Sequence, residues 1–175
     1  MDRDTQMVTG LFRDRDSAER AYRAVSDKGY SANDVNIVMS DATRKRYFAG
    51  ETPANATTEL GNKAAKGAGV GGAIGGTIGA IAAAVAAVGT SLVIPGLALV
   101  VAGPVAAALA GGGAGAAGGG LIGALVGWGI PEERVKHYEA GIKEGGILMG
   151  VTPRSDADAH HFEEAWGRSG EHVYR

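Results

Sequence analysis

Hydrophobic and polar positions alternate loosely at the beginning of the chain. Val8 and Phe12 fall on one side of an extended segment, and Met7 and Leu11 fall on the other. This period of two predicts a short strand over residues 7–12.

A helical pattern follows this strand. Asp16 and Glu19 form a capping-box pattern that marks the start of a helix, and Gly29 suits its left-handed end. The apolar run of residues 35–39 predicts a strand in the centre of a sheet. Residues 1–40 therefore predict a strand, a helix and a second strand.

Residues 131–175 repeat this order after one additional helix. Pro131 suits the first position of that helix. Val135, Tyr138 and Ile142 form its apolar stripe, and a pair of glycines ends it.

A strand, a capped helix and an edge strand then complete the chain. Residues 147–151 alternate as a strand, Ser155 begins the helix as its N-cap, and residues 172–174 predict the edge strand. The apolar face of this last helix consists of Ala159, Phe162 and Trp166.

Each end of the chain therefore predicts one strand–helix–strand unit. Two such units, with antiparallel strands and both helices on one face, make an α+β fold with the ferredoxin-like arrangement. Residues 41–66 are polar and lack a sustained period, so they predict a linker. Residues 67–130 are then a large insertion between the two halves.

The inserted stretch carries no charged residue, and glycine recurs in it at every fourth position. The first series consists of Gly67, Gly71, Gly75 and Gly79, and the second consists of Gly111, Gly115, Gly119, Gly123 and Gly127. Each glycine inside a helix costs about 0.8–1 kcal/mol relative to alanine, so a close packing partner must offset this cost. A helix face without side chains allows that close approach. The pattern predicts a glycine-zipper helical hairpin, in which the first zipper packs on the second, as a device for self-association.

Proline and glycine mark the predicted turn of this hairpin. Pro95, Gly96, Gly103 and Pro104 bracket residues 97–101, which predicts a hydrophobic tip between two helices. The two helices are predicted over residues 67 to about 93 and 104 to about 128. Each exceeds the roughly 20 residues that cross a hydrocarbon core, so one interpretation is a membrane hairpin. The alternative is a soluble homo-oligomer with buried hairpins, because alanine and glycine insert weakly and an aromatic belt is almost lacking.

Composition and charge exclude several classes of function. The net charge of -2 and the pI near 6.1 provide no basic field for nucleic acid. The lack of cysteine excludes disulfides, thiolate nucleophiles and cysteine metal sites. Residues 1–5 are polar, and no secretory signal is expected there.

Reactive side chains do not converge in the sequence. His160 and His161 point about 100° apart on a helix, and Asp156 with His160 supplies too few ligands for a metal, so we interpret this cluster as a solvated face. The glycines of residues 67–72 follow no strand and lack the lysine of a phosphate-binding loop. We therefore predict no catalytic residue, metal, cofactor or small-molecule ligand.

Several motifs of the chain form a recognisable set. They are Val8 to Phe12, Gly29-Tyr30, Val35 to Val38, Ile94 to Gly96, Ala102 to Pro104, Gly129 to Glu133 and Tyr138 to Gly146. Together they resemble the bacterial general stress protein family, described as heat-induced or low-temperature-induced, with its YflT-like N-terminal domain. The resemblance spans nearly the whole chain and implies a role in the stress response. It implies no catalytic residues, because the family is of unknown biochemical function.

These observations lead to three hypotheses. The first is a non-enzymatic stress-response protein that self-associates through the hairpin in or against the bacterial inner membrane, with a cytoplasmic sheet domain. The second is a soluble, cytoplasmic homo-oligomer that acts as a structural or protective assembly. The third, an enzyme or small-molecule binder on the ferredoxin-like sheet, has the weakest support because no reactive constellation is present.

Overall fold

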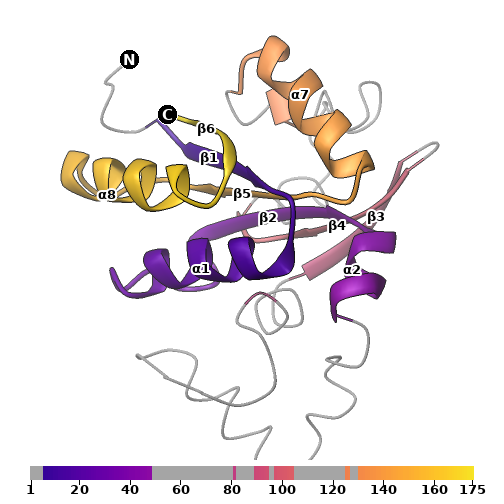
Figure 1. The fold of residues 1–175 in the computed structure, drawn as a ribbon, viewed down its shortest axis with the longest axis horizontal. Coiled ribbons are helices and arrows are strands. Elements are labelled where there is room, and N and C mark those ends of the chain that lie inside the picture. Colours follow the sequence, from indigo (N-terminus) through magenta and orange to yellow (C-terminus); the bar gives the residue numbers. More distant parts are fainter. Residues whose placement is uncertain (1–5, 49–80, 82–88, 95–96, 105–124, 127–129) are drawn as a thin grey trace, which may run out of the picture.

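The computed structural model describes residues 6–48, 81, 89–94, 97–104, 125–126 and 130–175. The strands are β1 (Val8–Phe12), β2 (Val35–Ser40), β3 (Gly89–Ile94), β4 (Leu97–Ala102), β5 (Ile147–Val151) and β6 (Glu171–Tyr174). The helices whose full extent lies within these residues are α1 (Arg15–Ser26), α2 (Asp41–Phe48), α7 (Glu132–Lys143) and α8 (Asp156–Gly167). The strands form one six-stranded sheet in the order β3-β4-β2-β5-β1-β6 (Figure 1).

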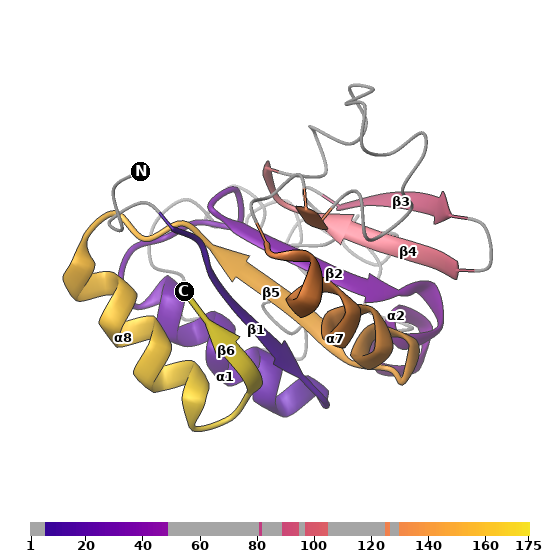
Figure 2. The ribbon, with the colours of Figure 1, turned by 90° about the horizontal axis from the view of Figure 1, so that it is seen from above.

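Every pair of neighbouring strands in this sheet is antiparallel. The hairpin of β3 and β4 lies beside β2 at one end of the sheet, and β6 lies beside β1 at the other end (Figure 2). The prediction of a mixed fold of helices and antiparallel strands is confirmed.

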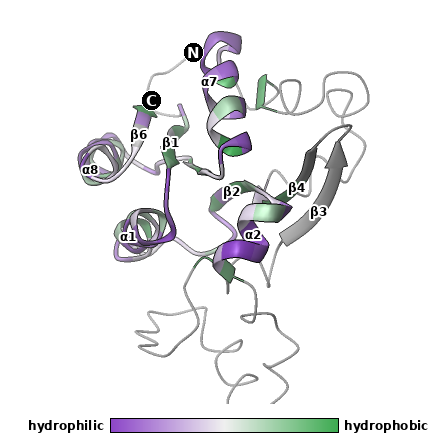
Figure 3. Cartoon of the chain, turned by 45° about the vertical axis from the view of Figure 1, so that its right-hand side comes forward, coloured by the Kyte–Doolittle hydropathy of each residue, from purple (hydrophilic) through white to green (hydrophobic). Residues whose placement is uncertain are grey.

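The sheet carries a hydrophobic core on each face, because successive side chains of a strand point to opposite sides. On one face α1 and α8 cover Val8, Phe12 and the alternate residues of β2 and β5. On the other face α7 covers Leu11, Val38 and Leu148. Figure 3 views α1 and α8 nearly end-on, on the same side of the sheet, with α7 on the other side.

The start of α1 differs from the sequence prediction. Its N-cap is Asp14, which has an extended backbone and whose side-chain Oδ1 atom accepts the Ser17 N–H at 2.8 Å. Asp16 lies in the first turn, where a carboxylate favours the positive end of the helix. The predicted capping box is therefore wrong, because an aspartate two residues earlier already caps the helix. Gly29 has a φ of +79°, as the predicted left-handed end requires.

The predicted linker begins with a helix, α2, which the hydrophobic pattern does not reveal. Only Thr43 and Phe48 of α2 are buried, too few for a visible apolar period. The Ser40 hydroxyl accepts the Thr43 N–H at 3.0 Å, and Asp41 forms ion pairs with Arg44 and Lys45 at 2.9 and 2.7 Å. These local contacts stabilise a short helix without a stripe. The rest of the predicted linker, residues 49–66, lies outside the described residues.

The middle of the predicted helical hairpin consists of strands. Residues 89–94 and 97–102 form β3 and β4, and β4 pairs with β2 from Ile37↔Ala102 to Ser40↔Leu99. Residues branched at Cβ favour an extended backbone, and β3 contains one threonine, one valine and one isoleucine, while β4 contains two valines. The prediction of helix up to residue 93 and of a tip at residues 97–101 is therefore wrong.

The second half of the chain follows its prediction closely. Val135, Tyr138 and Ile142 are all buried on α7, although Pro131 is the N-cap of this helix and not its first residue. Ser155 caps α8 by accepting the Asp158 N–H at 3.1 Å. The buried residues of α8 are the predicted Ala159, Phe162 and Trp166.

Candidate functional site

The predicted zipper glycines lie outside the described residues, together with Pro95 and Gly96. They are Gly67, Gly71, Gly75, Gly79, Gly111, Gly115, Gly119, Gly123 and Gly127. The structure does describe the points where the glycine-rich parts of the chain join the sheet. We call residues 49–80 the first segment and residues 105–124 the second segment, and we call the described residues that hold their ends the anchors.

Gly103 is the anchor at the end of β4. Its φ is +102°, and a Cβ atom on it would lie 2.2 Å from the carbonyl oxygen of Val35 and 2.9 Å from the Cα of Asn36. Only glycine tolerates both this backbone conformation and this close approach. Gly103 and the exposed Pro104 therefore end a strand against the start of β2, and do not end a hydrophobic tip between helices.

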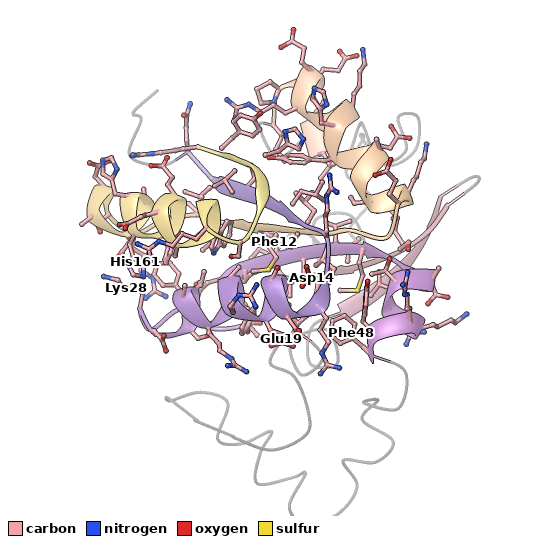
Figure 4. All side chains as sticks on the ribbon, in the orientation of Figure 1. Phe12, Asp14, Glu19, Lys28, Phe48 and His161 are labelled. Atoms are coloured by element: carbon pink, nitrogen blue, oxygen red, sulfur yellow. The ribbon has the colours of Figure 1, made fainter. Side chains whose placement is uncertain are left out.

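The first segment is anchored on the face covered by α1 and α8. Phe48 precedes it and Ile81 follows it, and both belong to the core of that face. Ile81 is fully buried, and its N–H donates to Oε1 of Glu19 at 3.3 Å. Figure 4 shows Glu19 on α1 and Phe48 at the end of α2, on the same side of the sheet.

Glu19 is a charged residue in a position usually filled by an apolar one. Only 7% of its surface is exposed. Burial raises the pKa of Tyr22, one turn along α1, and the charge of Glu19 raises that pKa further. The Tyr22 hydroxyl therefore stays protonated at neutral pH. A buried carboxylate is stabilised by the N–H groups that donate hydrogen bonds to it. The bond from Ile81 to Glu19 therefore holds the chain after the first segment against α1.

Arg15 holds the other end of the first segment. Its guanidinium donates to the carbonyl oxygen of Tyr47 at 2.8 Å and lies 5.2 Å from the centre of the Phe48 ring. Arg15 and Glu19 are four residues apart on α1, so they lie on one side of the helix. This side of α1 contacts the chain both before and after the first segment.

The second segment is anchored on the opposite face. Leu125 is fully buried and Ile130 is 5% exposed, and both pack in the core beneath α7. The Ile130 N–H donates to the Leu125 carbonyl oxygen at 3.3 Å. The second segment thus begins after Gly103 at the end of β4 and returns to the face that α7 covers.

The β3–β4 ladder brings together the start of β3 and the end of β4. Gly89 pairs with Ala102, so the chain enters β3 and leaves β4 at the same end of this hairpin. The anchors nevertheless lie on different faces, because Phe48 and Ile81 pack on one face of the sheet and Leu125 packs on the other.

The histidine cluster of α8 lies on the surface. His160 is 3.6 Å from Asp156 and 3.5 Å from Glu163, and 71% of its side chain is exposed. Within the described ranges, no three histidine or carboxylate side chains gather as metal ligands do. His161, beside it, is half-buried, and its ring lies 5.9 Å from the ring of Phe162.

A polar cluster beneath β6 was not identified from the sequence. The Tyr138 hydroxyl lies 2.8 Å from Oγ1 of Thr9 and donates to the carbonyl oxygen of His172 at 3.0 Å. Burial raises the pKa of Tyr138, so its hydroxyl remains a donor at neutral pH. His172 has a φ of 51°, unusual for a residue with a side chain. The sequence contained one sign of this cluster, because Tyr138 places a polar hydroxyl in the otherwise apolar stripe of α7.

Aromatic and basic side chains cover the same cluster. The rings of His137 and His172 are 5.3 Å apart and 15° from parallel, and Arg134 lies 4.4 Å from the centre of the Tyr174 ring. These contacts join α7 to the strand at the edge of the sheet. Their role is to hold β6 in place, since each polar atom of the Thr9–Tyr138 pair already has a protein partner.

Comparisons of the chain with protein-family models, with curated proteins and with solved structures give no match. No helix within the described part of the chain has both the length and the apolar character needed to cross a membrane.

Proposed function

We propose that this protein is a non-enzymatic stress-response protein that self-associates, with its two glycine-rich segments packing against segments of other copies. The observation that carries this proposal is the separation of the anchors. Phe48 and Ile81 belong to one core of the sheet, and Leu125 belongs to the other. The first zipper is held at both ends on one face, and the second ends on the other face, so the zippers of neighbouring molecules match them more readily than they match each other.

The energetics of glycine support a requirement for such partners. An unpaired helix with glycine at every fourth position is disfavoured by about 0.8–1 kcal/mol per glycine. Close backbone packing between copies offsets this cost through dispersion contacts and weak Cα–H···O bonds. Association that supplies these contacts then depends on protein concentration.

The body of each copy, in this proposal, is a ferredoxin-like unit. The supporting features are the order β2-β5-β1-β6, the antiparallel pairing, and the units β1-α1-β2 and β5-α8-β6 with both helices on one face. The β3–β4 hairpin extends this unit beyond β2. The context of stress rests on the resemblance in sequence.

The anchors favour an assembly of copies over a hairpin that crosses the bilayer. β3 and β4 belong to the sheet, so described residues of the domain flank each glycine-rich segment on both sides. A helix that crosses a hydrocarbon core and a second one that returns need roughly 40 residues together. Residues 49–80 and residues 105–124 are each shorter than this. We therefore favour the soluble homo-oligomer over the membrane-embedded form. Any contact with lipid in this proposal is made at the surface of the bilayer.

The test compares zipper and non-zipper positions. Gly75→Leu and Gly119→Leu fill the predicted close-approach groove, whereas Ala83→Leu adds the same side chain outside the glycine series. We expect each glycine variant to weaken association at least about tenfold in light scattering or sedimentation, which is the effect of a lost close contact of about 1.4 kcal/mol. Ala83→Leu should stay close to wild type.

Two outcomes would contradict the proposal. A wild-type protein that is monomeric at all accessible concentrations would remove self-association altogether. Equal tolerance of leucine at residues 75, 83 and 119 would leave self-association but remove the zippers as its cause. Recovery of the protein only in the detergent-soluble membrane fraction of a lysate would instead restore the membrane hypothesis.

A further inference from the structure

β3 is the outermost strand of the sheet, next to β4 alone (Figure 2). Among the strands that the structure describes, none pairs with its outer side. Its sequence, Gly-Thr-Ser-Leu-Val-Ile, contains no charged residue and no proline. Edge strands that avoid pairing usually carry a charge, a proline or a bulge, and β3 pairs with β4 without a break in register.

The pairing with β4 fixes which backbone groups of β3 point outward. Ile94 and Leu97 are partners across a connection of two residues, and such a flanking pair exchanges both hydrogen bonds. Bonded and non-bonded pairs alternate along an antiparallel ladder, so Thr90, Leu92 and Ile94 bond to β4. The N–H and C=O groups of Gly89, Ser91 and Val93 therefore face away from the sheet.

This outward set is symmetric about Ser91. We infer that β3 pairs with β3 of a second copy, antiparallel, with Ser91 opposite Ser91 and Gly89 opposite Val93. Each of these three bonded pairs exchanges two hydrogen bonds, which gives about six across the junction. The contact is a two-fold, self-complementary interface that joins two sheets into one.

A second copy fits this edge because the junction consists of backbone groups. A two-fold axis through Ser91 presents the same donors and acceptors in reverse order, so each outward backbone group of one copy meets its complement on the other. The interface is separate from the zippers of the proposed function. It predicts association at the β3 edge even when the glycine series is disrupted.

The first test is cross-linking at the two-fold axis. The chain contains no cysteine, so Ser91→Cys introduces a single thiol. Opposed residues of a bonded pair have Cα atoms about 5.5 Å apart, within the range of about 4.4–6.8 Å that a disulfide requires. Under a mild oxidant we expect most of the Ser91→Cys protein to become a disulfide-linked dimer. The exposed Thr152 lies after β5, and Thr152→Cys should remain mostly unlinked under the same conditions.

The second test removes an outward N–H. Ser91→Pro deletes a donor that the ladder with β4 does not use, and proline is tolerated at such an edge position. In the Gly75→Leu/Gly119→Leu background, Ser91→Pro should weaken dimer formation at least about tenfold, since two hydrogen bonds are lost. Its melting temperature at low protein concentration should match that of the background. Leu92→Pro removes a bond to β4 and should lower the melting temperature.

The outcomes distinguish this inference from the proposed function. A Ser91 cross-link that persists in the double leucine variant supports the β3 junction, whatever the zippers do. Absence of the cross-link in both the wild-type and double leucine backgrounds overturns the junction. It is also overturned if Ser91→Pro leaves the dimer dissociation constant unchanged.

Discussion

The two edges of the sheet are built differently. At one edge, β6 is a strand of four residues whose pairing with β1 shifts register between Thr9 and Leu11. His172 interrupts it with a positive φ, and side chains of α7 bond to it or stack on it. At the other edge, β3 has six residues, pairs with β4 without a shift, and carries no charge.

We call the edge formed by β6 the closed edge of the sheet and the edge formed by β3 the open edge. A short, bulged strand offers few regularly spaced backbone groups to another chain, so β6 ends the sheet. A regularly paired, uncharged strand offers a continuous row of such groups, so β3 can extend the sheet. We infer that association of this protein is directed to the β3 end, where the inner ends of both glycine-rich parts also meet the sheet.

The largest effect is expected from detaching the open edge. Gly103→Ala places a Cβ within 2.2 Å of the Val35 carbonyl oxygen, and its φ of +102° is strained for alanine. We expect a loss of roughly 2–5 kcal/mol in the free energy of unfolding, combining backbone strain and steric overlap. Urea denaturation measures this loss.

Gly29→Ala is the matched control for this variant. Gly29 also has a positive φ, +79°, but a Cβ there would meet nothing within 4 Å. Its cost should be limited to backbone strain, about 1–2 kcal/mol. Equal destabilisation by the two alanines would show that the contact with β2 does not depend on glycine at residue 103.

A smaller effect is expected from opening the closed edge. Tyr138→Phe leaves the Thr9 hydroxyl and the His172 carbonyl without the tyrosine oxygen that both contact. The expected cost is about 1–3 kcal/mol, the usual penalty for buried polar groups that lose a partner. Amide hydrogen exchange should accelerate in β6 more than in β3. Uniform acceleration across the sheet would contradict a local role in holding β6.

The smallest effect on stability is expected from acid. It concerns Asp34, which lies directly before β2, the strand that pairs with β4. Burial acts to raise the pKa of Asp34, but hydrogen bonds from the N–H and hydroxyl of Ser31 and the charge of Arg154 outweigh it and lower that pKa below its usual value. The stabilisation is therefore present above the ordinary aspartate pKa and is lost as the pH falls through the lower, folded-state value.

The measurement for this prediction is the free energy of unfolding from pH 6 down to pH 2, in wild type and Asp34→Asn. Because Asp34 is partly exposed, the difference should be less than about 1 kcal/mol. Wild type should lose its advantage over Asp34→Asn below about pH 4. Parallel curves for the two proteins would show that this carboxylate is not coupled to folding.

The sequence predicted well the elements that show a clear period. Strands β1, β2, β5 and β6 and helices α1, α7 and α8 follow from alternation, helical stripes and caps such as Ser155. It failed for α2, which is held by Ser40, Asp41 and Phe48 and has no stripe. It also failed for β3 and β4, because an uncharged apolar run suits a buried helix and a buried strand equally.

The candidate site was predictable only in part. Glycine at residue 103 was identified as a turn, but its contact with Val35 depends on a distant strand. The bond between Glu19 and Ile81 likewise joins residues that no local pattern relates. The separation of Phe48 and Leu125 onto opposite faces follows from the topology of the sheet, which a linear pattern does not specify.

The position of β5 in the sheet has a consequence for synthesis of the protein. β5 lies between β2 and β1 and is hydrogen-bonded to both, yet it follows the glycine-rich segments in the chain. On the ribosome, both segments therefore emerge before the sheet can close around its central strand. Contacts so distant in sequence form slowly, so the domain of a nascent chain at this stage is incomplete. In the assembly that we propose, neighbouring chains on one polysome would then be the first copies that these segments meet.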